Sequence, residues 1–153
     1  ATLLTPTEAV LAKKRGYGEI YDLLDMGFEV QGNGFATSRG FIKANRAAAK
    51  AAVKGYVEAI YYIHNNAEGT KAIVGKYLRT NDQEVLTAAH QGFVKLVAKK
   101  PYPTLKGIQF LLDEITGKLP QAKKAKPEQF VDFSLLQELE KEGFFTEMAK
   151  RYP

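Results

Sequence analysis

Few side chains in this sequence have the type and spacing that catalysis requires. The chain has 153 residues and no cysteine, which excludes disulfides, thiolate metal sites and a cysteine nucleophile. Its two histidines, His64 and His90, belong to no His-Glu-x-x-His metal motif. Both lie among polar neighbours on predicted helices, so we expect each to be a surface or half-buried residue. The histidines therefore give no support to an enzyme or a metal site.

The other enzyme motifs are incomplete. Ser38 does not lie in a Gly-x-Ser-x-Gly elbow. Gly32-Asn33-Gly34 begins like a dinucleotide-binding fingerprint, but Thr37 stands where the third glycine belongs. Asp113 and Glu114 are adjacent on a predicted helix, so they diverge by about 100° and are expected to be solvated. We therefore expect a protein that is not an enzyme, with no catalytic residue, no metal and no cofactor.

Two turns could hold a small ligand without any bond being made. At Leu4-Thr5-Pro6-Thr7 a predicted strand leads into a helix, whose free N–H groups favour an anion or a carbonyl. The Thr5 hydroxyl could join them, unless it serves only as a helix cap. At Gln31-Gly32-Asn33-Gly34 the glycines allow close backbone approach or hinge motion, and Gln31 and Asn33 supply amide donors and acceptors. A bent strand without a ligand is the alternative for this second turn.

Mostly helices would position these residues. Thr5, Pro6 and Glu8 form a capping box with proline at the first helical position, which predicts a helix that Gly16 ends. We expect short strands over residues 1–4 and 28–31, the second interrupted by glycines and continued over 35–38. From Ser38 onward the periodicity is helical, with helices expected over 47–66, 67–77, 82–98, 104–116 and 135–142 and a last turn after Gly143.

Two further caps and one loop complete the expected elements. Asn81 is the expected cap of the helix over 82–98, and Ser134 with Gln137 reads as a second capping box. Residues 117–127 are expected to form a loop. Two or three short strands cannot make a sheet that covers about seven helices, so other strands must come from upstream sequence or another chain. We therefore expect a helix-dominated α/β fragment. The start at Ala1, without Met or a signal peptide, agrees with a processed or excised chain of about half the protein's size.

Positive charge is uneven along the sequence, and the basic excess is spread over its middle, residues 37–126. There are 22 Lys and Arg against 17 Asp and Glu, a net charge of +5, and the densest basic run extends from Lys118 to Lys126. Such a run could meet phosphates or anionic lipid, and a solvated loop is the alternative. No aromatic residue interleaves with these lysines, as a single-strand binding surface would require, so we expect no nucleic-acid partner. No apolar run approaches the roughly 20 residues of a membrane span.

The order of short motifs along the chain resembles one family. A Leu-Leu-Thr-Pro turn leads into a helix, and a glycine-rich segment follows. The later motifs are Ala36-Thr37-Ser38-Arg39-Gly40-Phe41-Ile42, Ala44-Asn45, Tyr56-Val57-Glu58-Ala59-Ile60, Lys76-Tyr77-Leu78, Pro101-Tyr102-Pro103-Thr104-Leu105-Lys106-Gly107-Ile108-Gln109, Val131-Asp132 and Leu139-Glu140-Lys141-Glu142-Gly143-Phe144. This pattern covers nearly all of the chain. It resembles the C-terminal half of ABC transporter solute-binding proteins of the nitrate/sulfonate/taurine type, which includes thiamine-pyrimidine-precursor binders.

The resemblance implies a two-lobed, Venus-flytrap binding protein with the type II periplasmic-binding-protein fold. Residues 1–34 would be the end of lobe two and the crossover or hinge strand, and residues 35–153 the helical portion that completes lobe one. Thr5, Gln31 and Asn33 would line the cleft. The protein would capture a small polar or anionic solute (sulfonate, nitrate or pyrimidine-like), dock on an ABC permease, and lie in the periplasm or another extracytoplasmic space.

Other readings of the sequence stay open. A helical interaction or scaffold module could complete itself by homo-oligomerisation, with residues 1–5 and 28–36 exchanging strands with a second copy. A nucleic-acid binder would use Lys118 to Lys126. An enzyme would need missing residues to complete its site. The sequence does not identify the solute.

Overall fold

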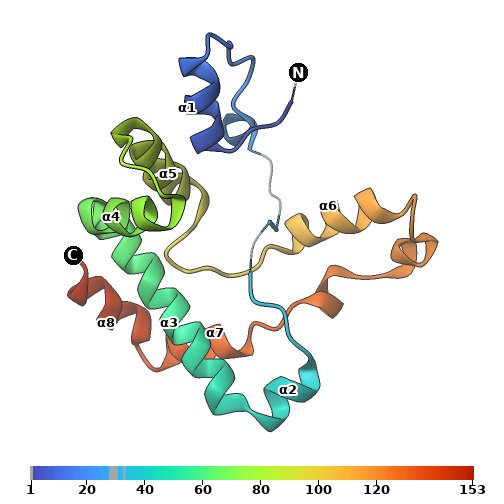
Figure 1. Ribbon diagram of the computed structural model, residues 1–153. Coiled ribbons are helices and arrows are strands. Elements are labelled where there is room, and N and C mark those ends of the chain that lie inside the picture. Colours follow the sequence, from blue (N-terminus) through green and yellow to red (C-terminus); the bar gives the residue numbers. More distant parts are fainter. Residues whose placement is uncertain (1, 28–30, 33) are drawn as a thin grey trace.

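Helices make up the molecule in the computed structural model, which describes residues 2–27, 31–32 and 34–153 (Figure 1). The helices lie close to the predicted ranges, and one 3-10 turn falls in the loop predicted over 117–127. In chain order the elements are α1 (Pro6–Lys14), η1 (Leu23–Met26), α2 (Arg39–Ala44), α3 (Arg46–Asn65), α4 (Ala67–Leu78), α5 (Gln83–Leu96), α6 (Leu105–Ile115), η2 (Pro120–Lys124), η3 (Pro127–Phe130), α7 (Ser134–Lys141) and α8 (Phe144–Arg151).

The predicted strands are not formed where the structure describes them. Residues 2–4 and 35–38 have no strand assignment, and no strand occurs elsewhere in the described ranges. A strand requires a neighbour to accept and donate its ladder hydrogen bonds, and the residues that the structure describes supply no such neighbour. Most of the strand predicted over 28–31 lies outside the described residues, which omit 28–30. Ala1 and Asn33 also lie outside them. The helix-dominated character is observed, while membership of a two-lobed α/β fold stays a prediction.

Local capping chemistry sets most helix boundaries. The predicted capping box of α1 is confirmed: Glu8 N donates to Thr5 Oγ1 at 3.4 Å, and Thr5 N donates to Glu8 Oε2 at 2.7 Å. Gly16 follows the helix with a φ of +83°, in the left-handed region that glycine tolerates. The cap predicted at Asn81 is wrong. The Asp82 carboxylate instead accepts the N–H groups of both Glu84 and Val85, because it is one residue closer to the first turn.

The capping box predicted at Ser134 is also wrong. Ser134 is the first residue of α7, and Phe133 precedes it with no side-chain cap. The Ser134 N–H donates instead to Asp132 Oδ1 at 2.9 Å, so a carboxylate two residues upstream satisfies the helix start. Hydrogen bonds from the side chain and then from the backbone N–H of Ser134 hold the pKa of Asp132 below its usual range, and the nearby guanidinium groups of Arg39 and Arg46 add to the effect.

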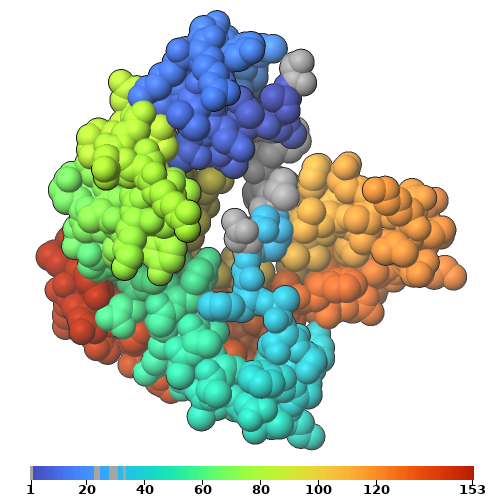
Figure 2. Space-filling model, in the orientation of Figure 1, coloured from blue at the N-terminus to red at the C-terminus, as the bar shows by residue number. Residues whose placement is uncertain are grey.

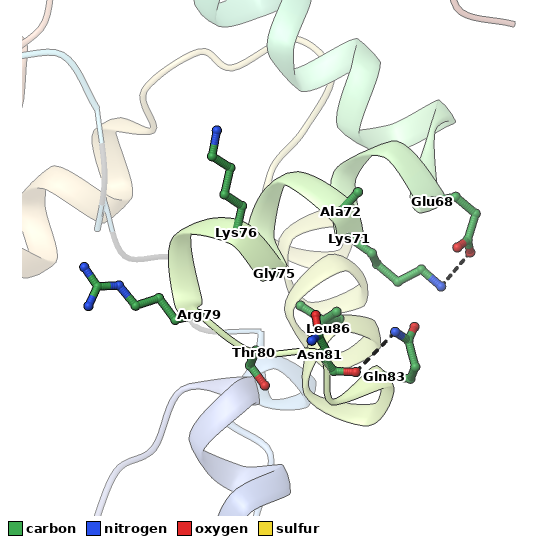
Figure 3. Close-up of a pocket in the computed structure, with 10 residues that line it drawn as sticks. All are labelled: Glu68, Lys71, Ala72, Gly75, Lys76, Arg79, Thr80, Asn81, Gln83 and Leu86. Carbon is green, nitrogen blue, oxygen red and sulfur yellow. Dashed lines mark hydrogen bonds and ion pairs between the residues drawn. The ribbon is translucent and has the colours of Figure 1, made fainter.

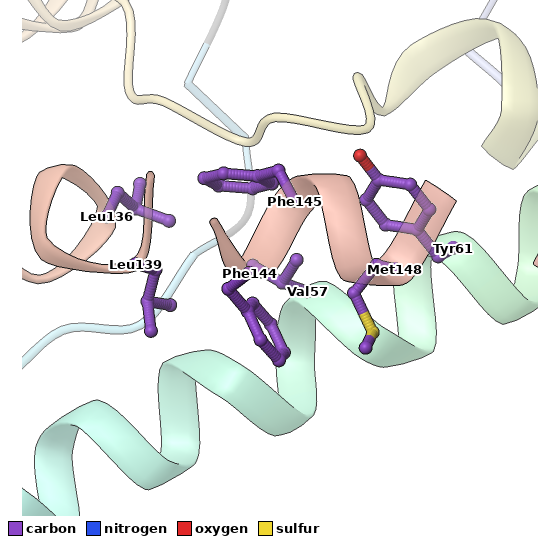
Figure 4. Close-up of a cluster of buried hydrophobic side chains, with 7 residues drawn as sticks. All are labelled: Val57, Tyr61, Leu136, Leu139, Phe144, Phe145 and Met148. Carbon is purple, nitrogen blue, oxygen red and sulfur yellow. The ribbon is translucent and has the colours of Figure 1, made fainter. Parts of the chain in front are cut away.

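The main apolar core lies where the two C-terminal helices cross the long helix α3 (Figure 4). Gly143, with a φ of +76°, makes the sharp turn that lays α7 and α8 on the same side of α3. The side chains of Val57, Leu139 and Met148 are 0%, 0% and 1% exposed. Burial of each such side chain stabilises the fold by roughly 1.5–3 kcal/mol. The rest of the cluster is Tyr61, Leu136, Phe144 and Phe145.

Charged side chains close the rim of this core. Arg46 pairs with Glu138, Lys50 pairs with Glu142, and Arg151 Nη1 lies 2.8 Å from Glu58 Oε1. Lys99 and Lys100 also lie over the rings of Tyr61 and Phe145, at 5.5 and 5.4 Å from the ring centroids. Exposed ion pairs of this kind contribute about 0.2–1 kcal/mol each, so apolar burial dominates the stability of this region.

A second packing region joins the N-terminal segment to α5. Lys14 Nζ lies 2.5 Å from Asp82 Oδ2 and 3.0 Å from Glu84 Oε2, and these carboxylates raise the pKa of the lysine. A Cβ added at Gly92 would lie 2.7 Å from Pro6 Cγ. Helix α1 therefore packs against α5 at a position where any side chain larger than that of glycine would collide with Pro6. No residue of α1 is itself buried, so this contact is shallow.

The third region is an arm made of α6, η2 and η3, residues 105–130, which projects from the body (Figures 1 and 2). Helix α6 packs on η2 and η3, with Leu112 and Ala122 buried between them. The guanidinium Nη2 of Arg39 in α2 donates to Gln129 O at 3.0 Å and ties the arm to the body. The apolar side chains of Leu105 and Ile115, at the two ends of α6, remain 36% and 40% exposed.

The three regions leave an unusually large surface. The accessible surface is 10906 Å². A compact monomer of 17.0 kDa has about 7,700 Å² by the usual scaling with mass. Large apolar side chains contribute to this surface, and Ile20 and Tyr77 are 85% and 81% exposed. Other exposed apolar side chains are those of Leu3, Tyr17, Tyr21, Phe35, Leu78, Leu96 and Phe130.

Matched glycine substitutions test the seating of α1 on α5. Gly92→Ala places a methyl group against the rigid ring of Pro6, and overpacking of this kind costs about 1–3 kcal/mol. Gly55→Ala, in an exposed position of α3 with nothing within 4 Å, should instead stabilise its helix by roughly 0.5–1 kcal/mol. Thermal unfolding followed by circular dichroism should therefore give a lower Tm for G92A and a higher Tm for G55A. An equal rise in both would contradict the Pro6 contact.

Candidate functional site

Thr5, the first predicted ligand contact, is exposed at the start of α1. Its hydroxyl lies 2.8 Å from Glu8 Oε2 and 3.1 Å from Thr7 Oγ1, in addition to its capping bond. Hydrogen bonds from the backbone and side chain of Thr5 lower the pKa of Glu8. A carboxylate of this chain therefore already occupies the helix N-terminus, and an anionic ligand would have to displace it.

The other two predicted contacts lie in the segment between η1 and α2. Gln31 is half-buried, and its amide Nε2 would lie 3.6 Å from a Cβ built on Gly34. Asn33 lies outside the described residues. Neither Thr5 nor Gln31 lines either of the two surface hollows described next. The cleft-lining role of Thr5, Gln31 and Asn33 thus stays a prediction.

The larger hollow, of about 500 Å³, lies between α4 and the start of α5 (Figure 3). It is built around Gly75, since a Cβ there would lie 2.9 Å from Thr80 O and 3.4 Å from Leu86 Cδ1. Arg79 ends α4 in the left-handed region, with a φ of +52°. The lining residues are Glu68, Lys71, Ala72, Gly75, Lys76, Arg79, Thr80, Asn81, Gln83 and Leu86.

Charged groups around this hollow do not converge on one point. Figure 3 shows Lys76 and Arg79 directed away from Lys71, whose ammonium lies 2.6 Å from Glu68 Oε1. A built anion site brings several donors to one oxygen-lined centre, and this arrangement does not. Sequence reasoning missed the hollow because tertiary packing of α4 on α5 creates it. Within the sequence, only Gly75 and the helix end at Arg79 could have indicated this hollow.

A smaller hollow of about 430 Å³ lies beside η1. Its carboxylates are already paired: Lys13 Nζ lies 2.5 Å from Glu19 Oε2, and Lys95 Nζ lies 2.7 Å from Asp25 Oδ1. Hydrogen bonds to Asp25 and then Asp22 raise the pKa of Lys95. The pairs made by Lys95 tie the N-terminal segment to α5. Because the charges around this hollow neutralise one another, little charge remains for a ligand.

Both histidines are half-buried, as predicted, and both join α3 to α5. His64 Nε2 donates to Val97 O at 2.7 Å, and His90 Nε2 donates to Ile63 O at 2.8 Å. Each ring therefore satisfies a carbonyl near a helix end. Asp113 and Glu114 are exposed, as predicted, and Gln109 Nε2 donates to Asp113 Oδ1 at 2.8 Å.

One cluster holds a strongly shifted titratable group. Burial, and next the hydrogen bond to Glu140, raises the pKa of Tyr102 to about 12. The Tyr102 hydroxyl donates to Glu140 Oε2 at 2.8 Å, and Lys100 Nζ lies 2.5 Å from Glu140 Oε1. These contacts hold the segment 97–104 against α7. Because Tyr102 keeps its proton at neutral pH, its hydroxyl is a poor proton acceptor.

Two wider observations apply to the described residues. They contain no group of three or more His, Asp or Glu side chains placed to hold a metal ion. None of the described helices has the length and apolar character needed to cross a bilayer.

Substitution of Thr5 separates capping from ligand contact. Thr5→Ala removes the oxygen that accepts the Glu8 N–H, and loss of such a cap costs about 1 kcal/mol. Thr5→Ser keeps that oxygen and serves as the control. We expect the ¹³Cα shifts of residues 6–9 to lose helical character in T5A and keep it in T5S. Equal helicity in both variants would show that the hydroxyl does not hold the helix and is free for another role.

Comparison of this chain with known proteins gave no match. No protein-family model, no curated protein and no solved structure matches it. The resemblance to solute-binding proteins therefore stands on the order of short motifs alone, and any function for the chain is a proposal.

Proposed function

We propose that this chain is part of the substrate-binding component of an ABC import system and captures a small solute without changing a bond. The observation that carries the proposal is the surplus of about 3,200 Å² of accessible surface over that of a compact monomer of this mass. A standard interface takes about 800 Å² from each partner, so the surplus is several times larger. A helical segment that normally packs on the sheet of a lobe would expose such a surface when that sheet is absent.

Helix α6 illustrates the point. Its apolar stripe includes Leu105, Leu112 and Ile115, but only Leu112 is buried. A helix with a stripe of this width normally packs on a sheet or on other helices. Strands supplied by a preceding half of the protein would bury it. This agrees with the motif order, which resembles the C-terminal half of the solute-binding family.

The candidate contacts do not make a complete site within this chain, so the proposal requires binding between two halves. Thr5 is engaged with Glu8, and the larger hollow lacks converging donors. In a two-lobed binder the solute is enclosed only when groups from both sides of the cleft meet around it. We propose a sulfonate, nitrate or pyrimidine-like solute, a permease as docking partner, and an extracytoplasmic location.

A second candidate rests on the same uncovered surface. A helical scaffold could bury its apolar side chains against a second copy, since obligate dimers bury 2,000–5,000 Å² or more in total. Light scattering separates the two readings. A stable dimer at micromolar concentration favours the scaffold, and a monomer that binds apolar dyes favours a segment waiting for its other half.

Calorimetric titration tests the binding proposal. Isolated residues 1–153 should give no measurable heat with taurine, nitrate or a hydroxymethyl-aminopyrimidine, because this chain alone does not enclose a solute. The same titrations with a longer natural polypeptide that includes the preceding half should give a micromolar constant for one of them. Micromolar binding by the isolated chain would contradict enclosure by two halves. Failure of the longer polypeptide with every solute would contradict the transport function.

A further inference from the structure

The tip of the projecting arm, residues 118–130, carries a group of uncompensated cations. Lys118, Lys123, Lys124 and Lys126 are all exposed. Within the described part of the chain none of their ammonium groups forms an ion pair, whereas eight other lysines and arginines do. Glu128 is the only carboxylate in the sequence of the tip. The tip therefore presents four positive charges against one negative charge.

The backbone of the tip is held in place. Ala122 is 9% exposed and anchors η2 on α6, while its N–H donates to Leu119 O at 2.9 Å. Pro120 and Pro127 begin the two 3-10 turns, and fixed φ angles stiffen both. Lys126 N donates to Gln129 Oε1 at 2.9 Å. The four lysines thus extend from a braced turn at the end of an arm, and not from an open coil.

Apolar side chains lie among these cations. Leu119 is 48% exposed and Phe130 is 59% exposed. Ile115, in the last turn of α6, is 40% exposed. Basic side chains next to exposed leucine and phenylalanine are typical of surfaces that rest at a membrane interface, where lysines meet headgroups and apolar groups enter the acyl boundary.

We propose that the arm tip docks on the surface of an anionic phospholipid bilayer. The four lysine ammonium groups contact headgroup phosphates, and Leu119 and Phe130 enter the interface. The charge of the tip complements an anionic leaflet, and its apolar side chains have no role in phosphate-backbone recognition. Nucleic acid fits less well, because stacking on bases requires aromatic residues between the lysines, and Phe130, the one aromatic residue of the tip, follows the lysine run and does not interleave with it.

Vesicle co-sedimentation of the whole chain tests this proposal. The probes are vesicles of phosphatidylcholine alone and vesicles in which about a third of the lipid is phosphatidylglycerol. We expect binding to the anionic vesicles only, weakening as salt rises. Each lysine near such a surface changes partitioning about fivefold, so the variant K118Q/K123Q/K124Q/K126Q should bind at least about a hundredfold more weakly.

A matched variant controls for net charge. Lys43, Lys76, Lys141 and Lys150 are exposed and likewise form no ion pair among the described residues. K43Q/K76Q/K141Q/K150Q lowers the net charge equally and should bind within about threefold of the parent chain. Leu119→Ser keeps every charge and should weaken binding about fivefold through lost apolar burial. Circular dichroism of each variant verifies that the helices persist.

Several outcomes would overturn the proposal. These are no binding to anionic vesicles at low salt, equal binding to phosphatidylcholine alone, or equal weakening in the two fourfold variants. Salt-sensitive binding to a DNA duplex without binding to anionic vesicles would also overturn it and would assign the tip to nucleic acid.

Discussion

The crossing of α7 and α8 over α3 is the interaction on which the rest of this structure depends. Val57, Leu139 and Met148 are almost wholly removed from water there, and Gly143 supplies the reversal that brings both C-terminal helices to one side of α3. This apolar contact orients both ends of the chain. The start of α3 fixes α2 and, through Arg39, the arm, while its end fixes α4 and α5 through the helix turn and the two histidine–carbonyl bonds. Helix α1 then follows α5.

Outward from that core the contacts become polar and shallow. Helix α1 has no buried residue and is held by Lys14 and the Pro6–Gly92 contact, and the arm buries chiefly Leu112 and Ala122. Exposed ion pairs contribute little, so these outer regions keep their shape with much less stabilisation than the core. The same regions carry most of the exposed apolar side chains. Both facts agree with a polypeptide whose outer helices await a covering layer, which is the basis of the proposed solute-binding role.

Much of the local structure could be predicted from the sequence, because caps and helical periodicity are encoded by near neighbours. Thr5, Pro6 and Glu8 predicted the start of α1, and Gly143 predicted the break before the last helical turn. Errors arose where two nearby side chains can cap the same helix. Asp82 and Asp132 accept the N–H groups that Asn81 and Ser134 were predicted to cap. The strands over 2–4 and 35–38 failed because β-pairing depends on a distant partner. The hollow at Gly75 was missed for a similar reason, since two helices must first pack to form it.

Peptide-level hydrogen exchange across the isolated chain tests the central claim most directly, namely that one apolar crossing stabilises the chain and the outer helices lack their cover. Amides of α3, α7 and α8 should exchange slowly, with protection near that of global unfolding, while those of α1 and of the arm should exchange orders of magnitude faster. Uniform slow exchange in all helices would contradict the account. It would mean that this chain already buries the apolar surface it needs.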